Sequence, residues 1–165
     1  MAGRSGGTPA TVALQKAGVI FTLHEYSHDP RAESFGLEAA DALGLDPRQV
    51  YKTLLADVDG STVVGIVPVA GSLDLKALAG AAGGRRAEMT DPARAQRLTG
   101  YVLGGISPVG QRRPLPTYLD DTALLWERVY VSGGRRGLDI GIAPTDLIAV
   151  TAAVTAPIGR SSATR

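Results

Sequence analysis

The chain contains no cysteine, which excludes a disulfide framework, a zinc–thiolate site and a cysteine nucleophile. Histidine is nearly as scarce, because only His24 and His28 are available for catalysis or metal binding. No apolar run reaches membrane-spanning length, and the first seven residues lack the apolar core of a signal peptide. A net charge of +1 argues against broad electrostatic capture of nucleic acid and leaves room only for local basic patches. We therefore expect a cytoplasmic protein with no membrane partner.

What remains is an ordinary globular composition, with 44% hydrophobic and 20% charged residues in a chain of 165. That length suits one domain with a substantial core. We expect a disordered Gly/Ser-rich segment over residues 1–7, a single domain over 8–159 and a loose tail over 160–165. Only three of the 17 cationic residues are lysines (Lys16, Lys52 and Lys76), so each lysine is a candidate for a specific role.

Cap and turn residues divide the chain into short elements. Thr8-Pro9, Ser34 and Ser72 are typical helix starts, Gly18 is a typical end, and Asp59-Gly60 predicts a tight hairpin. Helices are expected over residues 9–17, 35–43, 73–82, 92–99 and 144–150, and strands over 19–26, 50–57, 62–69, 117–120, 127–132 and 138–142. Because these elements are intermixed without regular βαβ alternation, the predicted class is α+β.

The stretch His24-Glu25-Tyr26-Ser27-His28 matches the H-E-x-x-H zinc pattern, but we reject a metal site there. The pattern works only on a helix, where residues four apart can share one ion. Here the preceding residues favour a strand, in which four residues span roughly 13 Å. Phosphate-binding and nucleophile-elbow motifs are also missing. Catalysis must therefore use backbone donors, Lys52, carboxylates, hydroxyls or groups of the substrate.

Two glycine-rich stretches attract attention, one over residues 104–110 and one over 133–137. Consecutive N–H groups in such a loop can form an anion-binding concavity, suited to an oxyanion or a phosphate. Taken alone, the first stretch is explained more simply as a tight connection between two strands. Arginines occur as pairs at 85–86, 112–113 and 135–136, and the last two pairs adjoin the glycine stretches. Paired cations beside a pocket suit a polyphosphate backbone, and isolated surface pairs in an arginine-rich protein are an equally plausible explanation.

Lys52 and Asp139 each allow two interpretations. Lys52 shares an apolar strand face, so its ammonium either reaches solvent or enters a pocket that binds a phosphate or carboxylate. Asp139 points away from Leu138 and Ile140, and a solvent-facing carboxylate is the ordinary explanation. Following a Gly/Arg loop, it could instead bind a substrate ammonium or pair with Lys52. Tyr26 and Phe35 are either core residues or an aromatic wall.

Three motifs in order resemble the YbaK family of free-standing aminoacyl-tRNA deacylases, which are related to the editing domain of bacterial prolyl-tRNA synthetase. They are residues 51–55 (Tyr-Lys-Thr-Leu-Leu), residues 100–110 around Gly-Gly-Ile-Ser-Pro-Val-Gly, and residues 131–139 (Val-Ser-Gly-Gly-Arg-Arg-Gly-Leu-Asp). The resemblance runs from about residue 8 to about residue 150. It implies an α+β fold with a mixed, barrel-like sheet flanked by helices.

The resemblance also implies a function: hydrolysis of mischarged tRNA, with Cys-tRNA(Pro) as our choice and Ala-tRNA(Pro) as the family's other preference. It assigns catalysis to Lys52, Gly104 and Gly105, with the lysine holding the acceptor end. It assigns substrate binding to Tyr26, Phe35, Thr53, Ser107, Pro108, Ser132 and Asp139, and we add tRNA contacts at Arg112, Arg113, Arg135 and Arg136. No metal or other cofactor is implied.

In the cysteine-specific branch the substrate thiol is thought to attack its own ester carbonyl, which would explain the absence of a nucleophile. A thiol with a pKa near 8.5 supplies some thiolate at neutral pH. A small domain of this kind is expected to need help in selecting tRNA, plausibly from prolyl-tRNA synthetase. The alternative class is a non-catalytic module that binds a nucleotide or a tRNA end in the same pocket.

Overall fold

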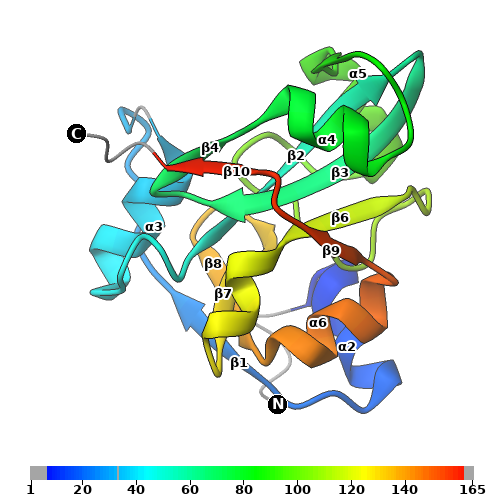
Figure 1. Cartoon of the computed structure of the whole chain (residues 1–165). Coiled ribbons are helices and arrows are strands. Elements are labelled where there is room, and N and C mark those ends of the chain that lie inside the picture. Colours follow the sequence, from blue (N-terminus) through cyan, green and yellow to red (C-terminus); the bar gives the residue numbers. More distant parts are fainter. Residues whose placement is uncertain (1–6, 33, 162–165) are drawn as a thin grey trace.

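The computed structural model describes residues 7–32 and 34–161, and Figure 1 shows the arrangement of its elements. The helices among these residues are α2 (Pro9–Ala17), α3 (Phe35–Leu43), α4 (Leu75–Ala81), α5 (Pro92–Thr99), α6 (Pro144–Thr151) and a 3-10 turn, η1 (Asp121–Leu125). The strands are β1 (Phe21–Glu25), β2 (Tyr51–Val58), β3 (Ser61–Pro68), β4 (Gly71–Leu73), β5 (Ala87–Met89), β6 (Thr117–Asp120), β7 (Val129–Arg135), β8 (Leu138–Ile142), β9 (Val154–Ala156) and β10 (Gly159–Ser161).

The strands form three sheets. A five-stranded sheet has the order β5-β2-β3-β6-β9, a three-stranded sheet has the order β1-β8-β7, and β10 pairs with β4. The large sheet is mixed, because β2 and β3 are antiparallel while β6 runs parallel to both β3 and β9. The α+β prediction is confirmed. The described strands do not close into one barrel, however, so the barrel-like description holds only loosely.

Local sequence signals placed most helix ends correctly. Thr8 caps α2 and the left-handed Gly18 ends it, and Ser34 and Gly44 do the same for α3. In each helix the side-chain oxygen accepts a hydrogen bond from a first-turn N–H that has no partner within the helix. Asp59 and Gly60 both have positive φ, at 49° and 87°, as the hairpin between β2 and β3 requires.

Three predicted boundaries were wrong. Ser72 lies in β4, and α4 begins after Asp74, whose side chain accepts from the Ala77 N–H. The second glycine stretch is not a loop throughout, because β7 continues to Arg135 with an irregular register after Ser132. The predicted tail overlaps β10, whose Arg160 and Ser161 pair with Ser72 and Gly71. Residues 1–6 and 162–165 of the predicted terminal segments lie outside the described residues.

The strand β2 carries the residues that the later argument uses, and its burial explains why they are fixed. Its Tyr51 and Leu55 pack in the larger of the hydrophobic clusters, while Ala56 and Val58 belong to a second one. Eight consecutive pairs with β3 hold the strand in register. Lys52 and Thr53 are therefore placed by a rigid element rather than by a loop. No helix within the described ranges is both long and apolar enough to cross a bilayer.

Candidate active site

A cavity of about 590 Å³ lies where β2 meets the glycine loop and the small sheet. Its walls come from the start of α3, from β2, from the segment leading into α5, from the loop over residues 103–106, and from β7 and β8. The predicted site residues that line it are Tyr26, Phe35, Lys52, Thr53, Gly104, Ser132 and Asp139. Residues more than 100 positions apart in the chain thus meet at one cavity.

Among the described residues, Lys52 is the only cation in the cavity wall. It is half-buried, and burial lowers the pKa of its ammonium group. It forms no ion pair with any described residue, so none of these residues offsets its partial desolvation. Of the two interpretations offered by the sequence, the pocket interpretation agrees with this position.

Asp139 lies on β8, the central strand of the three-stranded sheet, between His24 of β1 and Ser132 of β7. The residue is 5% exposed, so the interpretation as a solvent-facing carboxylate was wrong. Burial raises the pKa of Asp139 to about 7. No described residue forms an ion pair or side-chain hydrogen bond with it, which also rules out the suggested pairing with Lys52.

Thr53 and Ser132, which line the cavity beside Lys52 and Asp139, differ in whether the hydroxyl oxygen has a hydrogen-bond partner. Thr53 is 8% exposed, and its Oγ1 has no hydrogen-bond partner among the residues that the structure describes. The Ser132 Oγ accepts a hydrogen bond from the Gly134 N–H at 3.2 Å. Burial, and secondarily the charge of Asp139, raise the pKa of Tyr26 to about 12, so this phenol is protonated at neutral pH.

The glycine loop is shaped by close contact with the β7–β8 turn. Gly104 has φ of 84°, and a Cβ there would lie 2.8 Å from the Phe35 ring. A Cβ on Gly105 would lie 2.8 Å from the Cα of Arg135, so the two glycine-rich stretches pack against each other. The Gly105 N–H donates to the Val102 carbonyl, and this donor is therefore not free for an oxyanion.

Ser107 and Pro108, which the resemblance assigned to substrate binding, do not line the cavity. Both are buried within the glycine loop. The Ser107 Oγ accepts from the Val109 N–H, and its carbonyl accepts from the Gln111 side chain. This serine shapes the loop, because its polar atoms bond to neighbouring residues.

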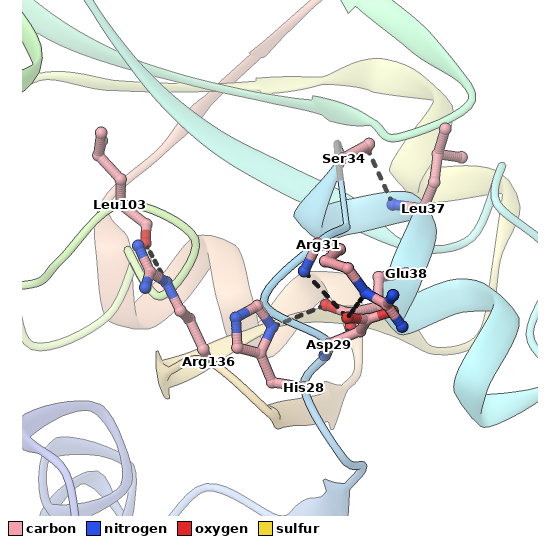
Figure 2. Close-up of polar contacts among 8 residues, drawn as sticks. All are labelled: His28, Asp29, Arg31, Ser34, Leu37, Glu38, Leu103 and Arg136. Atoms are coloured by element: carbon pink, nitrogen blue, oxygen red, sulfur yellow. Dashed lines mark hydrogen bonds and ion pairs between the residues drawn. The ribbon is translucent and has the colours of Figure 1, made fainter.

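The four predicted tRNA-binding arginines fall into two groups, and none lines the cavity. Arg112 and Arg113 are exposed, on the segment after the glycine loop. Arg135 forms a 2.7 Å ion pair with Glu25. The Arg136 Nε donates to the Leu103 carbonyl at 2.7 Å, as Figure 2 shows, and its guanidinium lies 4.9 Å from the centroid of the Phe35 ring.

Comparison with known proteins assigns this architecture. The family model described as "Aminoacyl-tRNA editing domain" matches residues 30–150. The chain belongs to this family. The predicted resemblance to YbaK-type proteins and the prediction of an aminoacyl-tRNA deacylase are thereby confirmed at family level.

Three similar proteins show how far the similarity of this editing domain extends. "Putative Cys-tRNA(Pro)/Cys-tRNA(Cys) deacylase EbsC" of Enterococcus faecalis is 38% identical over 114 residues, 68% of this chain and 69% of that protein. A proline–tRNA ligase of Maridesulfovibrio salexigens is 30% identical over 100 residues, which cover 61% of this chain but only 17% of the ligase. A crystal structure described as "a putative trans-editing enzyme for prolyl tRNA synthetase" matches with a TM-score of 0.83 and 28% identity, over 96% of this chain and 98% of that one.

Sequence reasoning missed one wall of the editing-domain cavity. Met89, Thr90, Asp91 and Pro92 line it together with Ala95 of α5, and Leu103 and Ile106 extend it along the glycine loop. The Asp91-Pro92 helix start was visible in the sequence, but it says nothing about which cavity the helix borders. That information depends on β5 pairing with β2, a contact between segments about 30 residues apart.

The two histidines make separate local contacts. His24 lies in β1, as the strand prediction required, and its Nε2 is 2.7 Å from the Thr22 hydroxyl. The His28 Nδ1 lies 2.9 Å from Glu38 Oε1 (Figure 2). Within residues 7–32 and 34–161, no group of three or more metal-binding side chains is placed to hold an ion.

Proposed function

We propose that this editing domain hydrolyses mischarged Cys-tRNA(Pro), using the substrate thiol as the nucleophile. One observation carries the proposal: the cavity contains a cation, a carboxyl and a hydroxyl, at Lys52, Asp139 and Thr53, and none has a partner in the described protein. Buried polar groups normally have partners, because leaving one unpaired costs free energy. A ligand that supplies an anion, a cation and a polar atom gives each of these three groups a partner.

The 3′ end of an aminoacyl-tRNA has these groups. Its phosphate suits Lys52, its α-ammonium suits the Asp139 carboxylate, and a ribose or ester oxygen can accept from the Thr53 hydroxyl. The half-buried Phe35 and Tyr26 supply aromatic surface in the same wall. In this pose the aminoacyl ester lies between Lys52 and Asp139.

The cavity wall supports a nucleophile supplied by the substrate. It contains no cysteine and no histidine, and its Ser132 has no base bonded to its hydroxyl. In the proposed step the cysteine thiolate attacks its own carbonyl carbon and forms a C–S bond. The C–O ester bond breaks, and the ribose oxygen leaves with a proton as the free 3′ end. Water then opens the thiolactone to free cysteine, so the protein mainly orients the thiol.

The decisive experiment compares discharge of Cys-tRNA(Pro), Ala-tRNA(Pro) and Pro-tRNA(Pro) under multiple turnover. The proposal expects rapid discharge of cysteine alone, with a thiolactone trapped by added hydroxylamine or an external amine. Discharge of alanine at a similar rate would rule out an obligatory substrate thiol. Binding of all three without turnover would identify a non-catalytic binding module.

A second candidate has its own supporting observation. A carboxyl with a pKa of about 7, such as Asp139, suits a general base that activates water near neutral pH. That chemistry needs no thiol and would favour Ala-tRNA(Pro). Substrates carrying S-methylcysteine separate the two routes, because blocking the thiol stops the first and leaves the second intact.

Prolyl-tRNA synthetase is the partner we propose for tRNA selection. The similarity to a segment covering 17% of a proline–tRNA ligase supports a related site. On this chain the proposed cavity reads only the charged 3′ end, which is common to all tRNAs. Co-sedimentation of this protein, the synthetase and tRNA(Pro) at low salt should give a ternary complex, and its absence would contradict the partnership.

A further inference from the structure

Arg136 bridges two walls of the cavity without lining it. Its guanidinium lies over the ring of Phe35, which belongs to α3, and its Nε donates to the carbonyl of Leu103 in the glycine loop. Phe35 and Leu103 both line the cavity, whereas Arg136 does not. A single side chain from the β7–β8 turn thus connects the aromatic wall to the glycine loop.

Neighbouring contacts support the same connection. The Phe35 ring also contacts the His28 ring at a centroid distance of 5.8 Å. The His28 ring is held by Glu38, which lies about one turn after Phe35 in α3. Glu38 also accepts a hydrogen bond from the Asp29 N–H (Figure 2). A Cβ on Gly104 would lie 3.0 Å from the Arg136 Nε, so the loop leaves no space between itself and this side chain.

We propose that Arg136 is a positioning residue that clamps the mouth of the cavity, and that its main role is not to bind a tRNA phosphate. The clamp holds Phe35 and the Leu103–Gly104 backbone at a fixed separation, so the cavity keeps its shape before substrate arrives. This proposal depends on the proposed function in one respect: it takes the group that the clamp positions to be an aminoacyl ester. It departs from the assignment of Arg136 as one of four equivalent tRNA contacts.

The chemistry of arginine explains why this residue is needed. A guanidinium can stack on a ring while its Nε–H donates in the plane of the group, whereas a lysine ammonium offers no such fixed geometry. Loss of both contacts should raise the frequency of loop opening roughly tenfold. Arg136→Lys keeps the charge and removes the geometry, so it separates a clamp from a phosphate contact.

The first test needs no substrate. The Gly105 N–H, bonded to the Val102 carbonyl, reports on the loop through its amide hydrogen exchange. In Arg136→Lys and Arg136→Ala we expect this exchange to accelerate roughly tenfold. Arg85→Ala is the matched control, because Arg85 is an exposed arginine whose side chain makes no ion pair among the described residues. Wild-type exchange in both Arg136 variants would overturn the proposal.

The second test separates the clamp from tRNA binding. Both Arg136 variants should lower kcat/KM for Cys-tRNA(Pro) and for a short cysteinylated acceptor-stem RNA by a similar factor, and the salt dependence of tRNA binding should stay as in wild type. If Arg136→Lys discharges normally and Arg136→Ala reduces the log–log salt slope by about one, Arg136 is a phosphate contact and the clamp is wrong. If wild type discharges no ester while exchange still accelerates in both variants, the proposed function fails and the clamp stands.

Discussion

Two cavities of similar size lie in this protein, and they differ in how their polar groups are satisfied. The candidate active site measures about 590 Å³, and a second cavity, lined by Arg48, Asp120, Trp126 and Arg160 among others, measures about 490 Å³. In the second cavity Arg48 pairs with Asp46 at 2.7 Å and Arg160 pairs with Asp74 at 3.3 Å. Its charged groups already have partners within the protein.

Asp120 makes the contrast sharper, because it is as buried as Asp139. Its Oδ1 accepts from the Ile158 and Gly159 N–H groups, and its Oδ2 accepts from the Thr122 hydroxyl. These donors tie the chain before β10 to the end of β6, so the carboxylate has a structural role. Asp139 has no such donors and its pKa rises instead. Size does not separate the two cavities, but the presence of unpaired polar groups does.

The largest expected effect follows from removing the unpaired cation. Lys52→Ala should lower kcat/KM for discharge by roughly 100-fold or more, because no other cation among the described lining residues can hold the acceptor phosphate. Lys52→Arg should restore little, since a longer planar group does not occupy the same position. Steady-state discharge assays measure both.

Arg48→Ala in the second cavity is the control for this loss. Arg48 is exposed and paired with Asp46, so discharge should stay within about twofold of wild type. If Arg48→Ala impaired discharge as much as Lys52→Ala, both cavities would contribute to activity and the comparison would fail.

The next effect concerns the unpaired carboxyl and depends on pH. The pKa of Asp139 is about 7 in the folded protein and near 4 when unfolded, so the folded state binds the extra proton between these values. Stability should therefore fall as pH rises from about 4 to about 7, by up to roughly 4 kcal/mol. Asp139→Asn should remove this component and be more stable than wild type at pH 8, as measured by urea unfolding.

Asp41→Asn serves as the comparison for that measurement. Asp41 is an exposed carboxylate on α3, and replacing it should leave the wild-type pH profile unchanged. Parallel profiles for wild type and Asp139→Asn would contradict the burial argument.

Asp120 is predicted to matter for stability and not for discharge. Asp120→Ala removes the acceptor of the Gly159 N–H and one of the two acceptors of the Ile158 N–H, which also donates to the Ala156 carbonyl, and should cost about 1–3 kcal/mol in unfolding free energy. Discharge per folded molecule should change little, because Asp120 lies outside the candidate active site. Urea titration with active-site-normalised assays measures both, and a folded but inactive variant would show that the two cavities are coupled.

Local signals predicted much of this fold but not its short strands. The caps at Thr8, Ser34 and Asp91 act within four residues, so the sequence alone locates α2, α3 and α5. The strands β4, β9 and β10 have three residues each and exist because of distant partners. No periodicity can be read from three residues, so a tail was predicted where β10 forms.

The sequence identified residues of the candidate site better than it predicted their burial and their contacts. Strand alternation placed Asp139 opposite an apolar pair, but it assumed that the other face of β8 meets solvent. All five β8 residues are buried, so both faces of the strand are covered, and β1 and β7 pair with its two edges. In the glycine loop, composition identified the segment but not which residues line the cavity: Gly104 does and Ser107 does not, and Gly105 packs against Arg135. Such packing is long-range and has no local signature.

The smallest effect tests whether the unpaired Thr53 hydroxyl lowers the stability of the free protein and contributes to discharge. Thr53 and Thr62 lie on the paired strands β2 and β3 and are both 8% exposed. The Thr62 hydroxyl donates to Asp57 at 2.7 Å, whereas the Thr53 hydroxyl has no partner in the described part of the chain. Thr53→Val should therefore stabilise the free protein by about 1 kcal/mol and still impair discharge. Thr62→Val should destabilise it by about 1–2 kcal/mol and leave discharge intact. Urea unfolding and discharge assays on this pair decide the matter: if Thr53→Val lost stability like Thr62→Val, its hydroxyl would already be satisfied in the free protein and would not be reserved for a substrate.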